Sequence, residues 1–248
     1  MRIIISPAKK MKRDEETLQY VGKPVFLDDA RRILTWMRQL SFGEAKALWK
    51  CNDTIARLNY DRFCNMDLEK NLTPALLSYV GIQYQYMAPA VFEDKMLTYV
   101  QEHLRILSGF YGVLKPMDGV TQYRLEMQAK AAVDGSADLY EFWGSRLYEE
   151  TADSEDGIII NLASREYSRC IENYLKPGDI FITCVFAEKK QGMLVQKGTY
   201  AKMARGEMVR FMAEKDVKQA EEIQEFDRLG YVFSPAHSND REFVFIRN

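Results

Sequence analysis

The chain opens with Met1-Arg2-Ile3-Ile4-Ile5-Ser6-Pro7-Ala8-Lys9-Lys10, and this stretch decides the interpretation of the fold. The apolar, β-branched run Arg2–Ser6 predicts a short buried strand, which the Ser-Pro step ends. Gly157–Leu162 predicts a second buried strand of the same kind. Helical segments alternate with strands along the chain, so we predict an α/β (mixed α+β) fold with a central β core wrapped by helices.

Periodicity and turn signals predict the other elements. Ser41 and Glu44 form a capping-box pattern, and Lys189-Lys190-Gln191-Gly192 predicts the turn of a hairpin. Because no repeat or linker interrupts the pattern, residues 1–248 are expected to form a single domain. The predicted helices are Leu27–Leu40, Ser41–Lys50, Asp53–Phe63, Glu93–Leu107, Asp138–Glu150, Ser164–Tyr174 and Thr199–Lys215. The other predicted strands are a bent strand over Leu76–Tyr86, the hairpin pair Asp179–Glu188 and Met193–Lys197, and the short strands Tyr231–Phe233 and Glu242–Ile246.

The formal net charge of the 248 residues is −2, whereas nucleic-acid-binding domains are usually basic overall. Net charge does not describe how charges are distributed, so a local basic cleft stays compatible with it. The N-terminal apolar stretch is too short for a signal peptide, and no segment approaches the roughly 20 apolar residues of a membrane helix. We therefore expect a cytoplasmic monomer without a membrane partner.

The cysteines and histidines do not form a recognisable metal-binding pattern. Cys51, Cys64, Cys170 and Cys184 include no C-x-x-C pair, and the two histidines lie far apart in the sequence. We expect buried or half-buried reduced thiols, no metal site and no cofactor.

The segment Ser6–Lys10 is the first candidate site. Ser6 could cap a helix that has Pro7 at its first position. Lys9 and Lys10 would then place two positive charges at the positive end of the helix dipole, which is unfavourable unless an anion binds there. The alternative is a loop with two solvated lysines.

The helix predicted over Tyr200–Met212 is the second candidate. Lys202, Gly206 and Arg210 would share one row on its surface, with Arg205 beside them. A glycine between two cations could let a backbone or a phosphate approach closely. The alternative is an ordinary amphipathic helix with a solvated face.

The segment His103–Pro116 is the third candidate, because it resembles a helix-hairpin-helix around Gly109-Phe110-Tyr111-Gly112. In that motif the hairpin amides hold a nucleic-acid phosphate beside nearby cations, here Arg105 and Lys115. The alternative is a helix that ends at Gly109 and is followed by a core loop.

Two further side chains are candidates for chemistry. Arg124 and Glu126 would point to the same face of a strand, either as a structural ion pair or as a catalytic carboxylate beside an anion-holding arginine. Asn161 lies at the end of the second buried strand, where ligands of α/β proteins collect.

Several long motifs identify a family resemblance. These motifs are Ser6–Lys9, His103–Pro116, Tyr123–Met127, Asp138–Gly144, Ile160–Tyr167 and Tyr200–Phe211. Through them the chain resembles the YaaA family, which is associated with the response to hydrogen peroxide. The resemblance implies a β core wrapped by helices, a helix-hairpin-helix-like element, a basic cleft, DNA binding and a role in limiting damage from unincorporated iron.

We therefore predict a DNA-binding stress protein that acts on double-stranded or distorted DNA. The alternative is an enzyme acting on a nucleotide or a DNA base, with Glu126 as the acid/base group, Asn161 as the substrate reader, and Tyr111, Tyr123 and Tyr140 available for stacking. Both hypotheses require the candidate side chains to converge on one cleft. The predicted DNA-binding residues are Lys9, Lys10, Arg105, Gly109, Gly112, Lys115, Arg124, Lys202, Arg205 and Arg210.

Overall fold

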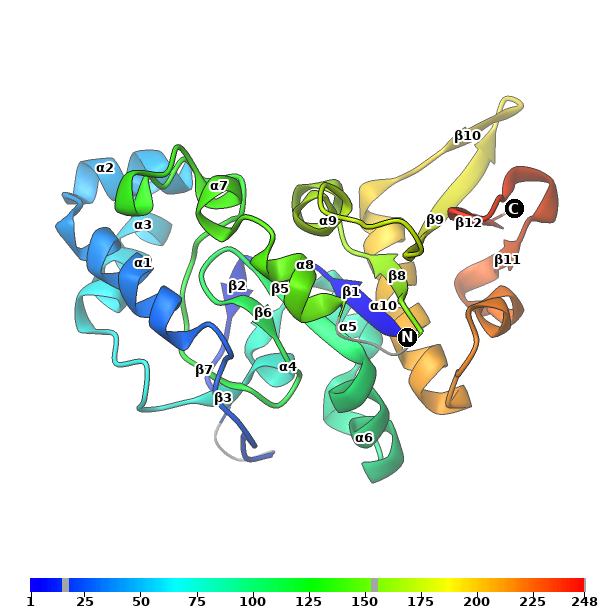
Figure 1. Ribbon diagram of the computed structural model, residues 1–248, viewed down its shortest axis with the longest axis horizontal. Helices are drawn as coiled ribbons and strands as arrows, with labels where there is room; N and C mark the ends of the chain where they lie inside the picture. Colours follow the sequence, from blue (N-terminus) through cyan, green and yellow to red (C-terminus); the bar gives the residue numbers. More distant parts are fainter. Residues whose placement is uncertain (15–17, 153–155, 248) are drawn as a thin grey trace.

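A mixed sheet runs through the middle of the computed structural model, which describes residues 1–14, 18–152 and 156–247 (Figure 1). Within these residues the sheet has eight strands in the order β11-β12-β9-β8-β1-β5-β6, and β10 pairs with β9. The strands of this sheet are β1 (Arg2–Ile5), β5 (Leu104–Ser108), β6 (Gly112–Leu114), β8 (Ile158–Leu162), β9 (Ile180–Lys190), β10 (Met193–Val195), β11 (Tyr231–Phe233) and β12 (Glu242–Arg247). Two small ladders add β2 (Lys10–Met11) to β4 (Tyr79–Val80) and β3 (Thr73–Pro74) to β7 (Gly119–Val120).

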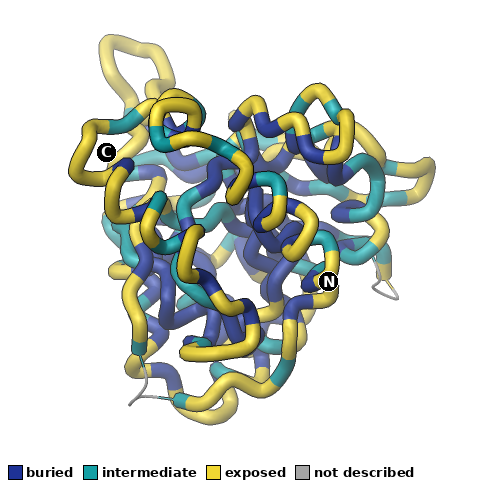
Figure 2. Tube along the Cα trace, turned by 90° about the vertical axis from the view of Figure 1, so that its left-hand side faces the viewer, coloured by how far each residue is buried: buried dark blue, intermediate teal, exposed yellow. Residues whose placement is uncertain are grey.

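Strand β1 lies at the centre of the sheet, parallel to both β5 and β8. Ile3, Ile4 and Ile5 are completely buried, because a central parallel strand is covered on both faces. That is why its sequence is a continuous apolar run rather than an alternating one. Figure 2 shows this buried centre and the exposed outer loops around it. The carboxyl ends of β1 and β8 meet at one edge of the sheet, where Ile5 pairs with Leu162.

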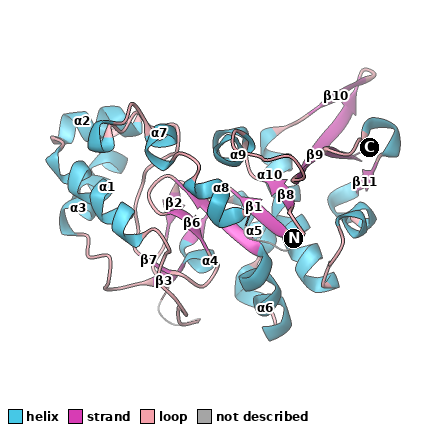
Figure 3. Cartoon of the chain, viewed as in Figure 1, coloured by secondary structure: helices cyan, strands magenta, loops and turns pink. Residues whose placement is uncertain are grey.

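Helices surround the sheet, as the mixed α/β prediction required (Figure 3). Helices α1, α2, α3 and α7 gather beyond the β6 edge, and the β9–β10 hairpin, β11 and β12 form the opposite end (Figure 1). The α-helices are α1 (Leu27–Gln39), α2 (Phe42–Trp49), α3 (Asp53–Asn65), α4 (Ala75–Ser78), α5 (Ile82–Met87), α6 (Asp94–His103), α7 (Leu139–Trp143), α8 (Arg146–Thr151), α9 (Arg165–Glu172) and α10 (Gly198–Lys215). Short 3₁₀ turns cover Pro89–Val91, Val133–Gly135, Ala220–Glu225, Arg228–Gly230 and Pro235–His237.

Elements with a strong local signal were predicted correctly. Ser41 and Glu44 form the expected capping box at the start of α2, and each accepts a hydrogen bond from the other's backbone amide. The β9–β10 hairpin turns at Gln191 and Gly192, which both have positive φ. Positive φ at two adjacent turn residues matches the right-handed twist of the flanking strands.

The segment His103–Pro116 does not form the helix-hairpin-helix that was predicted there. Helix α6 ends at His103, and the next residues form β5, which pairs with β1. The Gly109–Gly112 turn then connects β5 to the antiparallel strand β6. The run Leu104–Leu107 is therefore strand rather than helix, because its pairing partner lies about a hundred residues earlier in the chain.

Three other element predictions differ from the structure. Leu76–Tyr86 is not a bent strand but α4, β4 and α5 in succession, and the amides of Ala75 and Leu76 bond to the carbonyls of Asp118 and Pro116. The helix predicted over Asp138–Glu150 breaks into α7 and α8 at Gly144, which has positive φ. No helix begins at Ser6 and Pro7, because the chain continues into strand β2.

Candidate functional site

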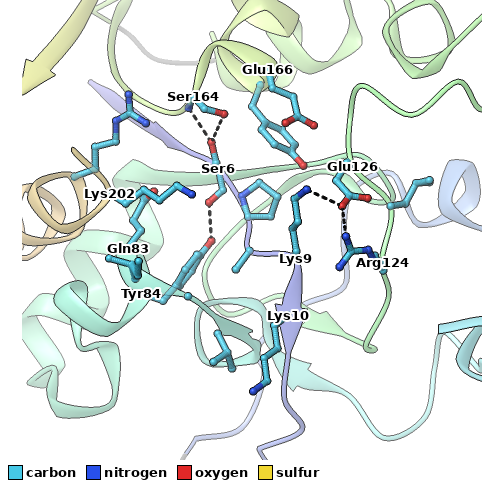
Figure 4. A pocket seen from close by; sticks show the side chains of 18 of the residues that line it. Ser6, Lys9, Lys10, Gln83, Tyr84, Arg124, Glu126, Ser164, Glu166 and Lys202 are labelled. Carbon is cyan, nitrogen blue, oxygen red and sulfur yellow. Dashed lines mark hydrogen bonds and ion pairs between the residues drawn. The ribbon is translucent and has the colours of Figure 1, made fainter. Parts of the chain in front are cut away.

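A pocket of about 400 Å³ lies at the carboxyl ends of β1 and β8 (Figure 4). Three continuous segments form most of its wall: Ser6–Lys10, Val80–Tyr84 and Tyr123–Glu126. Helices α9 and α10 complete it with Ser164, Glu166, Tyr167, Lys202 and Arg205. The edge where parallel strands end is the usual ligand site of such sheets, because the connecting loops converge there.

Ser6 joins the segment after β1 to the segment after β8. Its Oγ accepts a hydrogen bond from the backbone amide of Ser164 at 2.8 Å, and its carbonyl accepts one from the Tyr84 hydroxyl at 3.0 Å (Figure 4). Ser6 therefore does not cap a helix of its own. Ser6 instead fixes the loop that carries Lys9. Because no helix begins at Ser6, no helix dipole acts on Lys9 and Lys10, and that prediction is wrong.

The Glu126 carboxylate lines the pocket on the side away from α10 (Figure 4). Its Oε1 lies 2.8 Å from an Arg124 nitrogen and 3.2 Å from Lys9 Nζ (Figure 4). The Arg124 and Glu126 side chains are both about 12% exposed, whereas that of Lys9 is 63% exposed. The predicted Arg124–Glu126 ion pair is present, and Lys9 extends it toward the open side.

Gly109 determines where Glu126 lies. A Cβ at this position would come within 2.6 Å of the Leu125 carbonyl oxygen and 3.0 Å of the Glu126 carbonyl carbon. Only glycine lets the Leu125–Met127 backbone cross the turn after β5 at this distance.

Glu166 is a second carboxylate of the pocket, which the sequence analysis missed. Its Oε1 accepts a hydrogen bond from the Gln128 amide at 3.3 Å. Burial raises the pKa of Glu166, and the negative charge of Glu126 raises it further. The residue lies in the first turn of α9, where an acidic side chain is ordinary, so the sequence offered no separate signal.

Helices α5 and α10 form the wall opposite Glu126. A Cβ on Gly206 would overlap the Gln83 carbonyl oxygen, so this glycine serves the close packing of the two helices. The close packing brings Gln83, Lys202 and Arg205 to the pocket. The Lys202 ammonium group points toward Ser6 in Figure 4.

Two polar atoms on this wall have no protein partner. Gln83 Nε2 and Arg205 Nε are buried and make no hydrogen bond within the part of the chain that the structure describes. Burial also lowers the pKa of the Arg205 guanidinium. Buried donors without an acceptor are unfavourable, so these two atoms weaken the local packing energy of this wall. Gln83 was not predicted, since nothing in its local sequence distinguishes it.

Tyr123 lines the pocket, but its side chain is buried and its hydroxyl is already bonded. Its hydroxyl contacts the Tyr79 hydroxyl at 2.7 Å and Ser108 Oγ at 2.6 Å, and burial raises its pKa to about 12. Tyr111 is fully buried, and the Tyr140 hydroxyl donates to the Glu166 carbonyl. The predicted stacking role is therefore not available to Tyr111.

Several predicted site residues lie outside this pocket. Gly109 and Gly112 are buried, and the amides of Phe110 and Tyr111 donate to Ser108 Oγ instead of facing outward. Buried Arg105 donates to the carbonyls of Glu102 and Leu104. The remaining residues outside the pocket are Lys115, Asn161 and Arg210.

Each of these three has a local arrangement of its own. Lys115 is exposed near the β6–β7 connection. Asn161 accepts a hydrogen bond from the Ala163 amide and donates one to Thr183 Oγ1. It lines a different, more open groove. Arg210 is paired with Glu214 one turn further along α10.

The pocket concentrates positive charge in a chain whose net charge is −2. Its lining carries two carboxylates, Glu126 and Glu166, against five cations. The cations are Lys9, Lys10, Arg124, Lys202 and Arg205, although the Lys10 side chain points away from Glu126 in Figure 4.

The cysteines form no disulfide, and the potential metal ligands do not cluster among the described residues. All four cysteines are free, with Cys170 and Cys184 buried, Cys51 half-buried and Cys64 exposed, which corrects the expectation for Cys64. Among the described residues, no group of three or more His, Cys, Asp and Glu side chains is arranged to hold a metal ion. No described helix is both long and apolar enough to cross a membrane.

Comparison with known proteins gives a consistent family assignment. The family model described as peroxide stress protein YaaA matches residues 1–237. A UPF0246 protein of Agathobacter rectalis is 58% identical over 247 residues, covering 100% of this chain and 99% of the relative. UPF0246 proteins of Lachnoclostridium phytofermentans and Ligilactobacillus salivarius are 54% and 50% identical, covering 100% of this chain and 96% and 100% of the relatives. The chain belongs to the peroxide stress protein YaaA family.

Proposed function

We propose that this protein binds DNA during the response to hydrogen peroxide and so limits damage linked to unincorporated iron. The observation that carries the proposal is the charge of the pocket, whose lining holds five cations and two carboxylates in a chain of net charge −2. DNA backbone phosphates attract such a cluster with little regard to sequence. The family assignment supports the peroxide-stress part of the proposal.

The pocket residues would contribute to phosphate binding in different ways. Lys202 and Arg205 supply charge from α10, and Gln83 supplies an uncharged donor that has no acceptor within the described protein. Glu126 holds Arg124 and Lys9 in fixed orientations, which reduces the entropy lost when they bind an anion. Arg105, Gly109 and Gly112 are buried outside the pocket and are not part of this proposal.

A second candidate function is an enzyme that acts on a nucleotide or a DNA base. The pair of carboxylates favours it, because Glu126 is ion-paired whereas burial raises the pKa of Glu166. Two carboxyl groups in different environments can divide the roles of base and acid. Glu166 thereby supplies the second acid/base group that the sequence did not reveal.

Titration of duplex DNA at several salt concentrations tests the binding proposal. The affinity should fall with salt with a log–log slope of about −0.9 for each phosphate contacted. Lys202→Ala should weaken binding to all sequences and reduce the magnitude of that slope by about 1. Lys215→Ala is the matched control, because Lys215 is an exposed lysine at the end of the same helix that does not line the pocket. Equal loss in both variants would show that binding is not localised in the pocket.

A further inference from the structure

A second pocket of about 500 Å³ adjoins the first and shares two residues with it. The shared residues are Lys9 and Glu126, whose ion pair spans 3.2 Å. A ligand group in one pocket is therefore separated from a group in the other by a single pair of side chains. The second pocket is formed by α1, α2 and the segment after Glu126.

The walls of the second pocket are apolar and aromatic. Trp36 and Leu40 come from the end of α1, and Leu48 and Trp49 come from the end of α2. Ala129 completes the apolar surface. The chain contains three tryptophans, and two of them line this one pocket, whereas Trp143 is packed in the core.

Trp49 carries an unsatisfied donor. The residue is only 3% exposed, and its Nε1 makes no hydrogen bond within the described residues. A buried indole N–H normally has a partner, so this unpaired donor is unfavourable.

The polar rim of the second pocket is close to balanced in charge. Lys9, Lys50 and Lys130 stand against Glu44 and Glu126. The first pocket carries a larger excess of cations, so of the two it is the better place for a phosphate. The second pocket suits a planar, uncharged group with hydrogen-bond acceptors, which is the chemistry of a nucleobase.

We propose that the second pocket binds an unpaired base of a DNA strand whose phosphate lies in the first pocket. This inference rests on the proposed DNA-binding function. That function concerns the phosphate of the nucleotide, and this inference adds a site for the base. The base packs against Trp36 and the leucines of the pocket wall. Lys9 lies between the two pockets, beside the bond that joins sugar and phosphate. A base inside a duplex cannot reach such a site, so the ligand is single-stranded, bulged or otherwise distorted DNA.

Binding of two matched duplexes tests this proposal. One carries a single bulged thymidine, and the other carries an abasic residue at the same position. The wild-type protein should bind the thymidine bulge about tenfold more tightly, as expected for one stacked base. Ala47→Leu should abolish this difference while preserving affinity for the abasic duplex, because Ala47 is an exposed residue of α2 that lines only the second pocket.

A matched control variant lies far from both pockets in the sequence. Ala236→Leu enlarges an exposed alanine that lines neither pocket and should retain the preference. Equal affinity of the wild-type protein for both duplexes overturns the base site and leaves the DNA-binding function in place. Failure to bind either duplex overturns the DNA-binding function, and the base site with it.

Tryptophan fluorescence gives a second, independent readout. Thymidine 5′-monophosphate should quench the emission of the wild-type protein, and Trp36→Phe should reduce the quenched fraction. Ribose 5-phosphate, which lacks the base, should bind without comparable quenching. Equal quenching by both compounds would contradict a base stacked near Trp36.

Discussion

The side chain of Ser6 accepts a hydrogen bond from the backbone amide of Ser164 at 2.8 Å, although 158 positions separate the two residues. This bond joins the two loops that follow β1 and β8, and therefore holds Lys9 on one side of the pocket and Glu166 on the other.

Ser6→Ala should destabilise the protein by about 1–3 kcal/mol, because the Ser164 amide would lose its acceptor in a half-buried site. Urea unfolding measures this change. Ser136→Ala, which removes a hydroxyl bound only to a neighbouring carbonyl, should cost less. A Ser6→Ala protein of wild-type stability would show that another group satisfies the Ser164 amide.

Gly206→Ala should destabilise the protein by about 1–3 kcal/mol or more, because the new methyl group would overlap the α5 backbone at Gln83. Gly43 is also a helical glycine, but a Cβ there would meet no atom within 4 Å. Gly43→Ala should therefore be neutral or stabilising by up to about 1 kcal/mol. Thermal unfolding of both variants measures the contrast, and similar effects at the two sites would contradict the packing argument.

Glu126→Gln distinguishes the binding hypothesis from the enzymatic one. The substituted side chain would keep an oxygen that can accept a hydrogen bond from Arg124 but would lose the charge that repels phosphate, so DNA affinity should be equal or raised. In the binding hypothesis, a deletion strain carrying Glu126→Gln should survive peroxide as well as one carrying the wild-type gene. In the enzymatic hypothesis, Glu126→Gln and Glu166→Gln should each lose rescue while DNA affinity persists. The measurement pairs peroxide survival with DNA affinity for both variants.

Asp118 should make stability decrease as pH rises from about 4 to about 6. Burial raises its pKa from 3.8 to about 6, so over this range the folded protein holds a proton that the unfolded chain has released. Stability falls with pH wherever the folded state binds more protons. Asp118→Asn should remove up to about 3 kcal/mol of this dependence, since a shift of one pKa unit is worth about 1.4 kcal/mol. Urea unfolding of both proteins at the two ends of this pH range measures the difference, and an unchanged slope would contradict the assignment to Asp118.

The sequence alone determined the elements whose signals are local or continuous. Ile3–Ile5 and Ile158–Leu162 are runs of apolar residues, and such runs remain recognisable because a central parallel strand is buried on both faces. The capping box at Ser41 and the turn at Gln191–Gly192 depend on residues only a few positions apart. The Arg124–Glu126 pair is present as expected, but the strand from which it was predicted is not, because residues 123–126 form an irregular segment.

Tertiary structure decided the rest, because the relevant partners are far apart in the sequence. Leu104–Ser108 became a strand by pairing with β1, although its local pattern continues that of the preceding helix. Gly206 was expected to admit a backbone or a phosphate, and the structure shows that it admits the backbone of α5. Gly109 was expected in a phosphate-binding hairpin, whereas it lies against the Leu125–Met127 backbone. Only the folded chain brings Lys9, Glu126, Glu166 and Gln83 to one pocket, since sheet pairing and helix crossing, not local composition, set the distances between them.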